Sequence, residues 1–65
     1  MVRQRMVELR GNRTQQEIAE LLQITQQHYS NIESGKRGIK PKDFKKFEIV
    51  FNEDIHKLAP DIFLN

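Results

Sequence analysis

Two threonines, each standing before a short helical stretch, constrain the fold more than any other feature of the sequence. Thr14 is followed three residues later by Glu17, the spacing of a capping box, in which each side chain bonds the other residue's backbone N–H. This pattern predicts an eight-residue helix that begins at Gln15 and stops around Gln23. Thr25 is a second N-cap candidate and predicts a helix over residues 26–34, followed by Gly35 as the terminating residue. We therefore expect two short helices joined by a three-residue turn.

Three further helices are predicted from apolar spacing and from breaking residues. Residues spaced along one helical face predict a first helix that ends before Gly11; they are Val2, Met6 and Leu9. A fourth helix, with Pro41 in its first turn, is predicted from the shared face of Phe44, Phe47 and Phe51. A fifth helix is expected over residues 54–59, ended by Pro60, with residues 61–65 as an extension.

Size and composition exclude several classes of protein. The chain has 65 residues and no cysteine, so we expect one small domain over residues 1–65 whose core comes from packed helices alone. No apolar run is long enough for a membrane span or a secretory signal, and a cytoplasmic location is expected. The two histidines lie far apart in sequence, no catalytic constellation emerges, and we expect neither an enzyme nor a metal or other cofactor.

The positions of the charged residues are more informative than their net charge. Eleven basic against nine acidic residues give a net charge of only +2. The bases, however, flank the helix predicted after Thr25, whereas several acids lie toward the C-terminus. The flanking bases are Arg10, Arg13, Lys36, Arg37 and Lys40.

The central part of the chain resembles a known family. The run from Arg13 to Leu22, then Ile24-Thr25, then Ile32-Glu33-Ser34-Gly35-Lys36-Arg37, is similar almost position by position to the lambda-repressor-like (Cro/repressor-type, Xre-type) helix-turn-helix proteins. The resemblance covers residues 6 to about 58. It implies an all-α, compact five-helix DNA-binding domain whose second and third helices form the helix-turn-helix.

Two positions depart from the pattern of this family. Gln23 stands where glycine is usual, and a left-handed backbone there would cost a non-glycine residue roughly 1 kcal/mol. Tyr29 stands where Ile or Val usually packs. We expect its ring to be in the core and its hydroxyl to reach a partner or water, with a phosphate contact as the second interpretation.

The resemblance implies that the start of the third helix enters the major groove and that its outward side chains meet base edges. These side chains are Gln26, Gln27, Ser30 and Asn31. Gln and Asn both donate and accept hydrogen bonds, which suits the N6/N7 edge of adenine. The alternative is that they are merely solvated residues on an exposed helix face.

Other residues are candidates for contacts to the DNA backbone, which position a protein without reading sequence. Gln15 begins a helix whose free N–H groups can meet a phosphate, and the family uses Gln at this place. The remaining candidates are Thr25, Arg10, Arg13, His28, Lys36, Arg37 and Lys40. Arg10 has an alternative role in pairing with Glu17 or covering apolar surface, and the alternative for Lys40 is a simply solvated side chain.

One helix reads only a few base pairs, so the resemblance implies binding as a homodimer, at least on DNA, to a palindromic operator. The candidate dimer contacts, in and near the extension 60–65, are Ile55, Leu58, Ile62, Phe63 and Leu64. Ile62 and Phe63 could instead complete the monomer's core. The implied function is transcriptional regulation, by default repression, with double-stranded DNA as partner. The alternative is a protein-interaction module, such as an antitoxin or adaptor. A purely structural helical bundle is a third interpretation, which the outward Gln and Asn residues beside basic loops do not favour.

Overall fold

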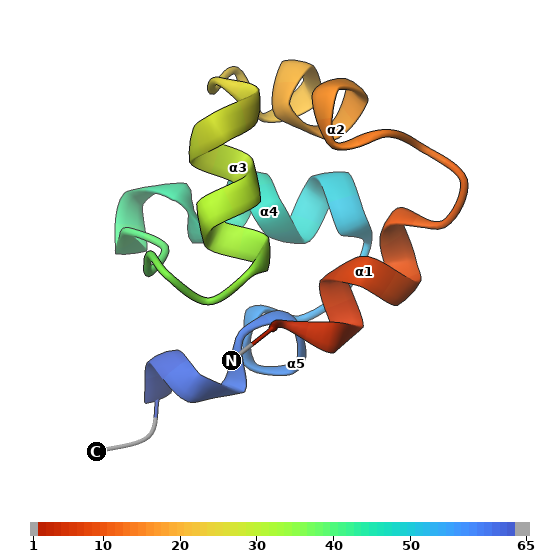
Figure 1. Ribbon diagram of the computed structural model, residues 1–65. Coiled ribbons are helices and arrows are strands. Elements are labelled where there is room, and N and C mark those ends of the chain that lie inside the picture. The colour runs from red at the N-terminus through yellow and green to blue at the C-terminus, as the bar shows by residue number, and fades with distance from the viewer. Residues whose placement is uncertain (1, 64–65) are drawn as a thin grey trace.

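The computed structural model describes residues 2–63, which form a small helical bundle (Figure 1). Its elements are α1 (Gln4–Arg10), α2 (Gln15–Leu22), α3 (Gln26–Glu33), the 3-10 turn η1 (Pro41–Asp43), α4 (Phe44–Phe51), α5 (Ile55–Leu58) and η2 (Pro60–Phe63). No strand occurs among these residues, and the all-α five-helix prediction is confirmed. None of the helices over residues 2–63 is long and apolar enough to cross a membrane.

The two threonine caps are present as predicted. The Thr14 hydroxyl accepts a hydrogen bond from the Glu17 amide at 3.0 Å, and the Thr14 amide donates to the Glu17 carboxylate at 3.0 Å. The Thr25 hydroxyl accepts from the amide of His28 at 3.0 Å. Between them, Gln23 ends α2 in the left-handed conformation, with φ 61° and ψ 40°. The sequence therefore determines both ends of the turn through local hydrogen bonds.

The core lies where α1, α2, α3, α4 and α5 meet. Met6, Ile18, Leu22, Tyr29 and Leu58 are its largest fully buried side chains. α2 and α3 pack most extensively against each other. The buried residues that complete the core are Ala19, Ile32, Ile39, Phe47, Phe51, Ile55 and Ala59.

The start of the chain differs from the sequence prediction. Val2 lies outside α1 and is 52% exposed, so its assignment to the buried face was wrong. Arg3 is buried instead, at 4% exposure. Its guanidinium donates to the backbone carbonyls of Ile32 and Arg37 and makes a two-pronged contact with the Asp61 carboxylate, at 3.1 and 2.9 Å. The spacing of apolar residues would put this charged side chain on the surface. The four hydrogen bonds compensate for its burial.

The two prolines begin 3-10 turns. Pro41 opens η1, and α4 begins only at Phe44. Pro60 follows α5 and opens η2, so the segment after α5 is a helical turn where the sequence predicted an extension. The fixed φ of proline suits the first position of such a turn, and its missing N–H is not needed there.

Candidate nucleic-acid interface

The outward face of α3 carries the four predicted base-reading residues. Gln26 and Gln27 are exposed, and Ser30 and Asn31 are half-buried. The Gln27 amide donates to the Asn31 side-chain oxygen at 3.2 Å. Because this bond is exposed and both amides keep further donors and acceptors, the pair can exchange it for bonds to a partner.

A shallow hollow of about 270 Å³ lies against this face. Gln27 and Asn31 line it from α3, together with the Thr25 cap and His28. Arg37 lines it from the loop that follows α3. The fold thus brings two predicted base-reading residues beside three predicted backbone-contacting residues.

The inner side of α3 is held by Glu33, a buried carboxylate at 5% exposure. It accepts hydrogen bonds from the Tyr29 hydroxyl at 2.7 Å, from the Arg10 guanidinium at 2.8 and 3.3 Å, and from the Gln15 amide at 2.9 Å. One carboxylate therefore joins α1, α2 and α3. The sequence analysis did not identify this role, although an acid at the helical spacing of Tyr29 and Ile32 was a usable signal.

These contacts shift the ionisation of the network. Burial raises the pKa of Tyr29, and the hydrogen bond that its hydroxyl donates to the Glu33 carboxylate raises it further, so the hydroxyl remains a donor. Burial also raises the pKa of Glu33, but hydrogen bonds from Arg10, Tyr29 and Gln15 outweigh burial and lower it below the ordinary value. The network is therefore a buried anion with donors on all sides.

Arg10 and Arg13 are engaged within the protein. Arg10 pairs with Glu33, not with Glu17, and also donates to the Arg13 carbonyl at 3.0 Å. The Arg13 guanidinium donates to the carbonyls of Leu9 and Arg10, at 3.0 and 3.2 Å, at the end of α1. Both side chains satisfy internal acceptors. For Arg10 the sequence predicted pairing with a carboxylate as the alternative to a phosphate contact, although with Glu17, and for Arg13 it predicted no structural alternative.

The loop after α3 is held by backbone hydrogen bonds, and its charged side chains are exposed to solvent. The Asn31 carbonyl accepts from the amides of Lys36 and Arg37 at 2.9 and 3.1 Å, after Gly35 has turned the chain at φ 84°. The side chains of Lys36, Arg37 and Lys40 are exposed. These three cations, all in the segment that follows α3, are therefore available to solvent.

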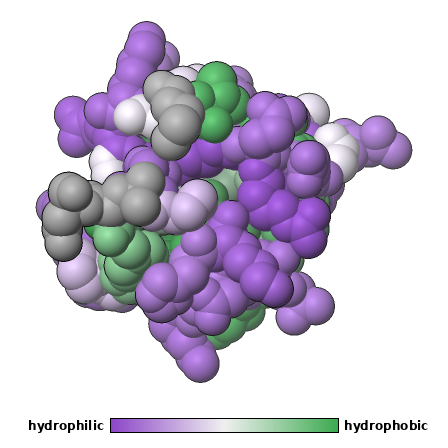
Figure 2. All heavy atoms as spheres, turned by 90° about the horizontal axis from the view of Figure 1, so that it is seen from below, coloured by the Kyte–Doolittle hydropathy of each residue, from purple (hydrophilic) through white to green (hydrophobic). Residues whose placement is uncertain are grey.

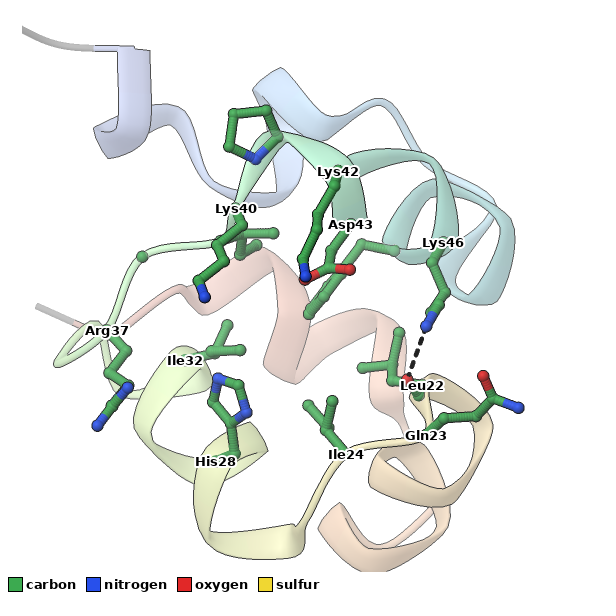
Figure 3. A pocket seen from close by; sticks show the side chains of 14 residues that line it. Leu22, Gln23, Ile24, His28, Ile32, Arg37, Lys40, Lys42, Asp43 and Lys46 are labelled. Carbon is green, nitrogen blue, oxygen red and sulfur yellow. Dashed lines mark hydrogen bonds between the residues drawn. The ribbon is translucent and has the colours of Figure 1, made fainter.

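A larger hollow, of about 690 Å³, lies beside the interface (Figure 3). It separates α3 and the end of α2 from η1 and the start of α4. His28 and Arg37 line both this hollow and the smaller one. In Figure 3 the side chains of Ile24, Ile32 and His28 are directed into the space from below, and Lys40 from above.

The candidate dimer residues are divided between core and surface. Ile55 and Leu58 are buried, at 5% and 0% exposure, because α5 uses them to cover the core, and they have no surface to offer a second copy. Ile62 is half-buried against the core, and Phe63 is 39% exposed. Leu64 lies outside the described residues. The face on the side of α5 is largely hydrophilic, with apolar side chains showing in separate patches (Figure 2).

Comparison with known proteins gives one match. A family model described as helix-turn-helix matches residues 3–58, which is most of the chain. No curated protein and no solved structure matches the sequence. The matched segment runs from the buried Arg3 to the buried Leu58 and includes both threonine caps, the whole of α3 and the basic loop.

Proposed function

The chain belongs to the lambda-repressor-like helix-turn-helix family of DNA-binding regulators, and we propose that it reads the major groove of double-stranded DNA with the outward face of α3. The observation that supports this most directly is the exposure of Gln26 and Gln27 at the first turn of α3, while Tyr29 and Glu33 fix the inner side of the same helix. Because the backbone of α3 is already fixed, only the side chains lose freedom on binding, which favours selective contacts to base edges.

Backbone contacts in this proposal surround the reading face. Lys36, Arg37 and Lys40 offer exposed charges on one side. Thr25 and His28 lie at the start of α3, and Gln15 lies in the first turn of α2. Each cation that meets a phosphate releases condensed counterions, so affinity falls steeply as the salt concentration rises.

The regulator is proposed to bind a palindromic operator as a homodimer and to repress by covering a promoter. A single α3 contacts too few base pairs for selectivity, and a two-fold pair doubles the site. With Ile55 and Leu58 in the core, η2 provides the candidate contact through Phe63 and the partly covered Ile62.

The test is selection from a random pool of duplex DNA, followed by a salt series on the selected site. The parent is compared with Gln27→Ala and with the control Gln16→Ala, which removes an equally exposed glutamine from the outer side of α2. We expect an enriched palindrome that relaxes at one position in Gln27→Ala alone, with a loss of about 1–3 kcal/mol in binding free energy.

A third variant, Lys36→Ala, distinguishes contacts that position the protein from contacts that read the bases. It should weaken all sites alike and reduce the slope of log affinity against log salt by about one. If no sequence is enriched even at low salt, the operator-binding proposal is wrong, and the exposed Phe63 makes a protein partner the next hypothesis.

A further inference from the structure

The larger hollow has an apolar floor. Core side chains lie directly beneath it: Leu22, Ile32, Ile39 and Phe47 line the hollow but are each no more than 6% exposed. Ile24, which is half-buried, extends the floor toward the turn between α2 and α3. A ligand placed there would cover the apolar surface that Ile24 leaves exposed.

The rim of the same hollow is strongly basic. Arg37, Lys40, Lys42 and Lys46 contribute four permanent cations, and Asp43 contributes the single carboxylate. Within residues 2–63 no carboxylate lies within ion-pair distance of any of these four cations. Lys46 instead donates to the Leu22 carbonyl at 3.3 Å, across the hollow's edge (Figure 3). The rim therefore carries positive charge that the protein itself does not neutralise.

An apolar floor below uncompensated cations defines the chemistry of the ligand. We propose that this hollow binds a small organic anion, a carboxylate carried on an aromatic or branched aliphatic body. Its volume, about 690 Å³, lies in the range of small-molecule sites, which are typically 300–1,000 Å³. The backbone of DNA would use the rim alone, since a phosphodiester has no apolar group to place against Ile24 and Ile39.

Such a ligand would also regulate the interface, a step that rests on the proposed function. His28 and Arg37 belong to both hollows, so an anion held beside them occupies the Arg37 guanidinium that would otherwise meet a phosphate. The ligand is therefore expected to weaken DNA binding, because two anions compete for the same cations.

The direct test uses 1-naphthoate as the probe and needs no DNA. It is titrated into the ¹⁵N-labelled protein, and its neutral analogue 1-naphthamide is titrated in parallel. We expect saturable shifts concentrated on residues 22–24, 28, 32 and 37–47, with a dissociation constant of about 1 mM or lower for a ligand of this size. The naphthamide should bind more weakly, because it lacks the charge that the rim attracts.

Paired variants test the rim. Lys40→Ala/Lys42→Ala removes two exposed cations of the hollow, and Lys45→Ala/Lys57→Ala removes two exposed cations outside it. The first pair should weaken naphthoate about five-fold or more, and the second should leave binding nearly unchanged. The proposal is overturned by shifts that do not saturate, by equal losses in the two double variants, or by equal binding of the naphthamide.

Because these measurements contain no DNA, the two proposals fail separately. Selection of an operator without naphthoate binding would remove only the ligand site. Naphthoate binding without operator selection would remove only the DNA-reading function.

Discussion

The Arg10 guanidinium and the Glu33 carboxylate form a two-pronged ion pair that joins the end of α1 to the end of α3, with Nε–Oε2 at 2.8 Å and Nη2–Oε1 at 3.3 Å. The side chains are 21% and 7% exposed. Removing one member of such a pair leaves the other charge without its partner, and this costs far more than the intact pair contributes.

Arg10→Met should therefore lower the free energy of unfolding by about 3 kcal/mol, measured by urea denaturation at pH 7. The double variant Arg10→Met/Glu33→Gln removes both charges and should regain part of that loss. Arg5→Met is the control, because Arg5 pairs with Glu53 at 2.9 Å on the surface, where its side chain is 47% exposed. If the Arg5 variant loses as much stability as the Arg10 variant, the buried ion pair with Glu33 contributes no more to the free energy of unfolding than a surface pair does.

The same carboxylate makes stability depend on pH. The pKa of Glu33 is raised by burial but lowered overall by its hydrogen bonds with Arg10, Tyr29 and Gln15, so it lies below its ordinary value of 4.5 in the folded state. As pH falls, the unfolded chain takes up this proton first, and the stabilisation is present at neutral pH and lost below about pH 4.5. Urea unfolding from pH 7 to pH 3 should show this decline, and Glu33→Gln should have a shallower one. Equal slopes for the two proteins would assign the decline to other carboxylates.

The sequence predicted the parts of the fold that depend on neighbours along the chain. The caps at Thr14 and Thr25 need only a hydroxyl and an amide three residues apart, and both occur where expected. Periodicity was less informative at the N-terminus, because the position of Arg3 depends on acceptors that lie 29 to 58 residues away. Such partners cannot be read from local spacing, so Val2 was assigned to the core in its place.

The candidate interface shows the same division. The outward residues of α3 followed from helical geometry and from the family resemblance. The guanidiniums of Arg10 and Arg13 could not be assigned in this way, because a cation near a binding helix can equally bind a carboxylate or a helix C-terminus. The basic hollow was also beyond sequence reasoning, since His28 and Lys46 become neighbours only when α3 and α4 pack around it.

The left-handed residue between α2 and α3 offers a site for stabilisation. Gln23 has φ 61°, a conformation that costs a residue with a Cβ roughly 1 kcal/mol relative to glycine. Gln23→Gly should raise the free energy of unfolding by about 0.5 kcal/mol, after allowance for the greater freedom of glycine in the unfolded chain. Gln16→Gly, in the exposed first turn of α2, should instead lower it, by less than about 1 kcal/mol. The thermal unfolding temperatures of the two variants should thus shift in opposite directions. A lower unfolding temperature for Gln23→Gly would contradict the claim that the left-handed backbone at Gln23 is strained.

Arg3 connects both ends of the described chain to the loop that carries Lys36 and Arg37. Its guanidinium bonds the Arg37 carbonyl at 2.6 Å and the Asp61 carboxylate at 2.9 and 3.1 Å. A lysine at this position would keep the charge but could not form the planar fork that reaches these acceptors together.

Arg3→Lys is therefore expected to speed amide hydrogen exchange over residues 34–39 about ten-fold, while the amides at the centre of α2 keep their rates apart from any global loss of stability. Arg5→Lys, two residues further along the chain and on the surface, should change neither group. Because Asp61 is partly solvated, with a side chain 26% exposed, Asp61→Asn should have a smaller effect than Arg3→Lys. Unchanged exchange in residues 34–39 of Arg3→Lys would show that Gly35 and the Asn31 carbonyl hold the loop without help from the chain ends.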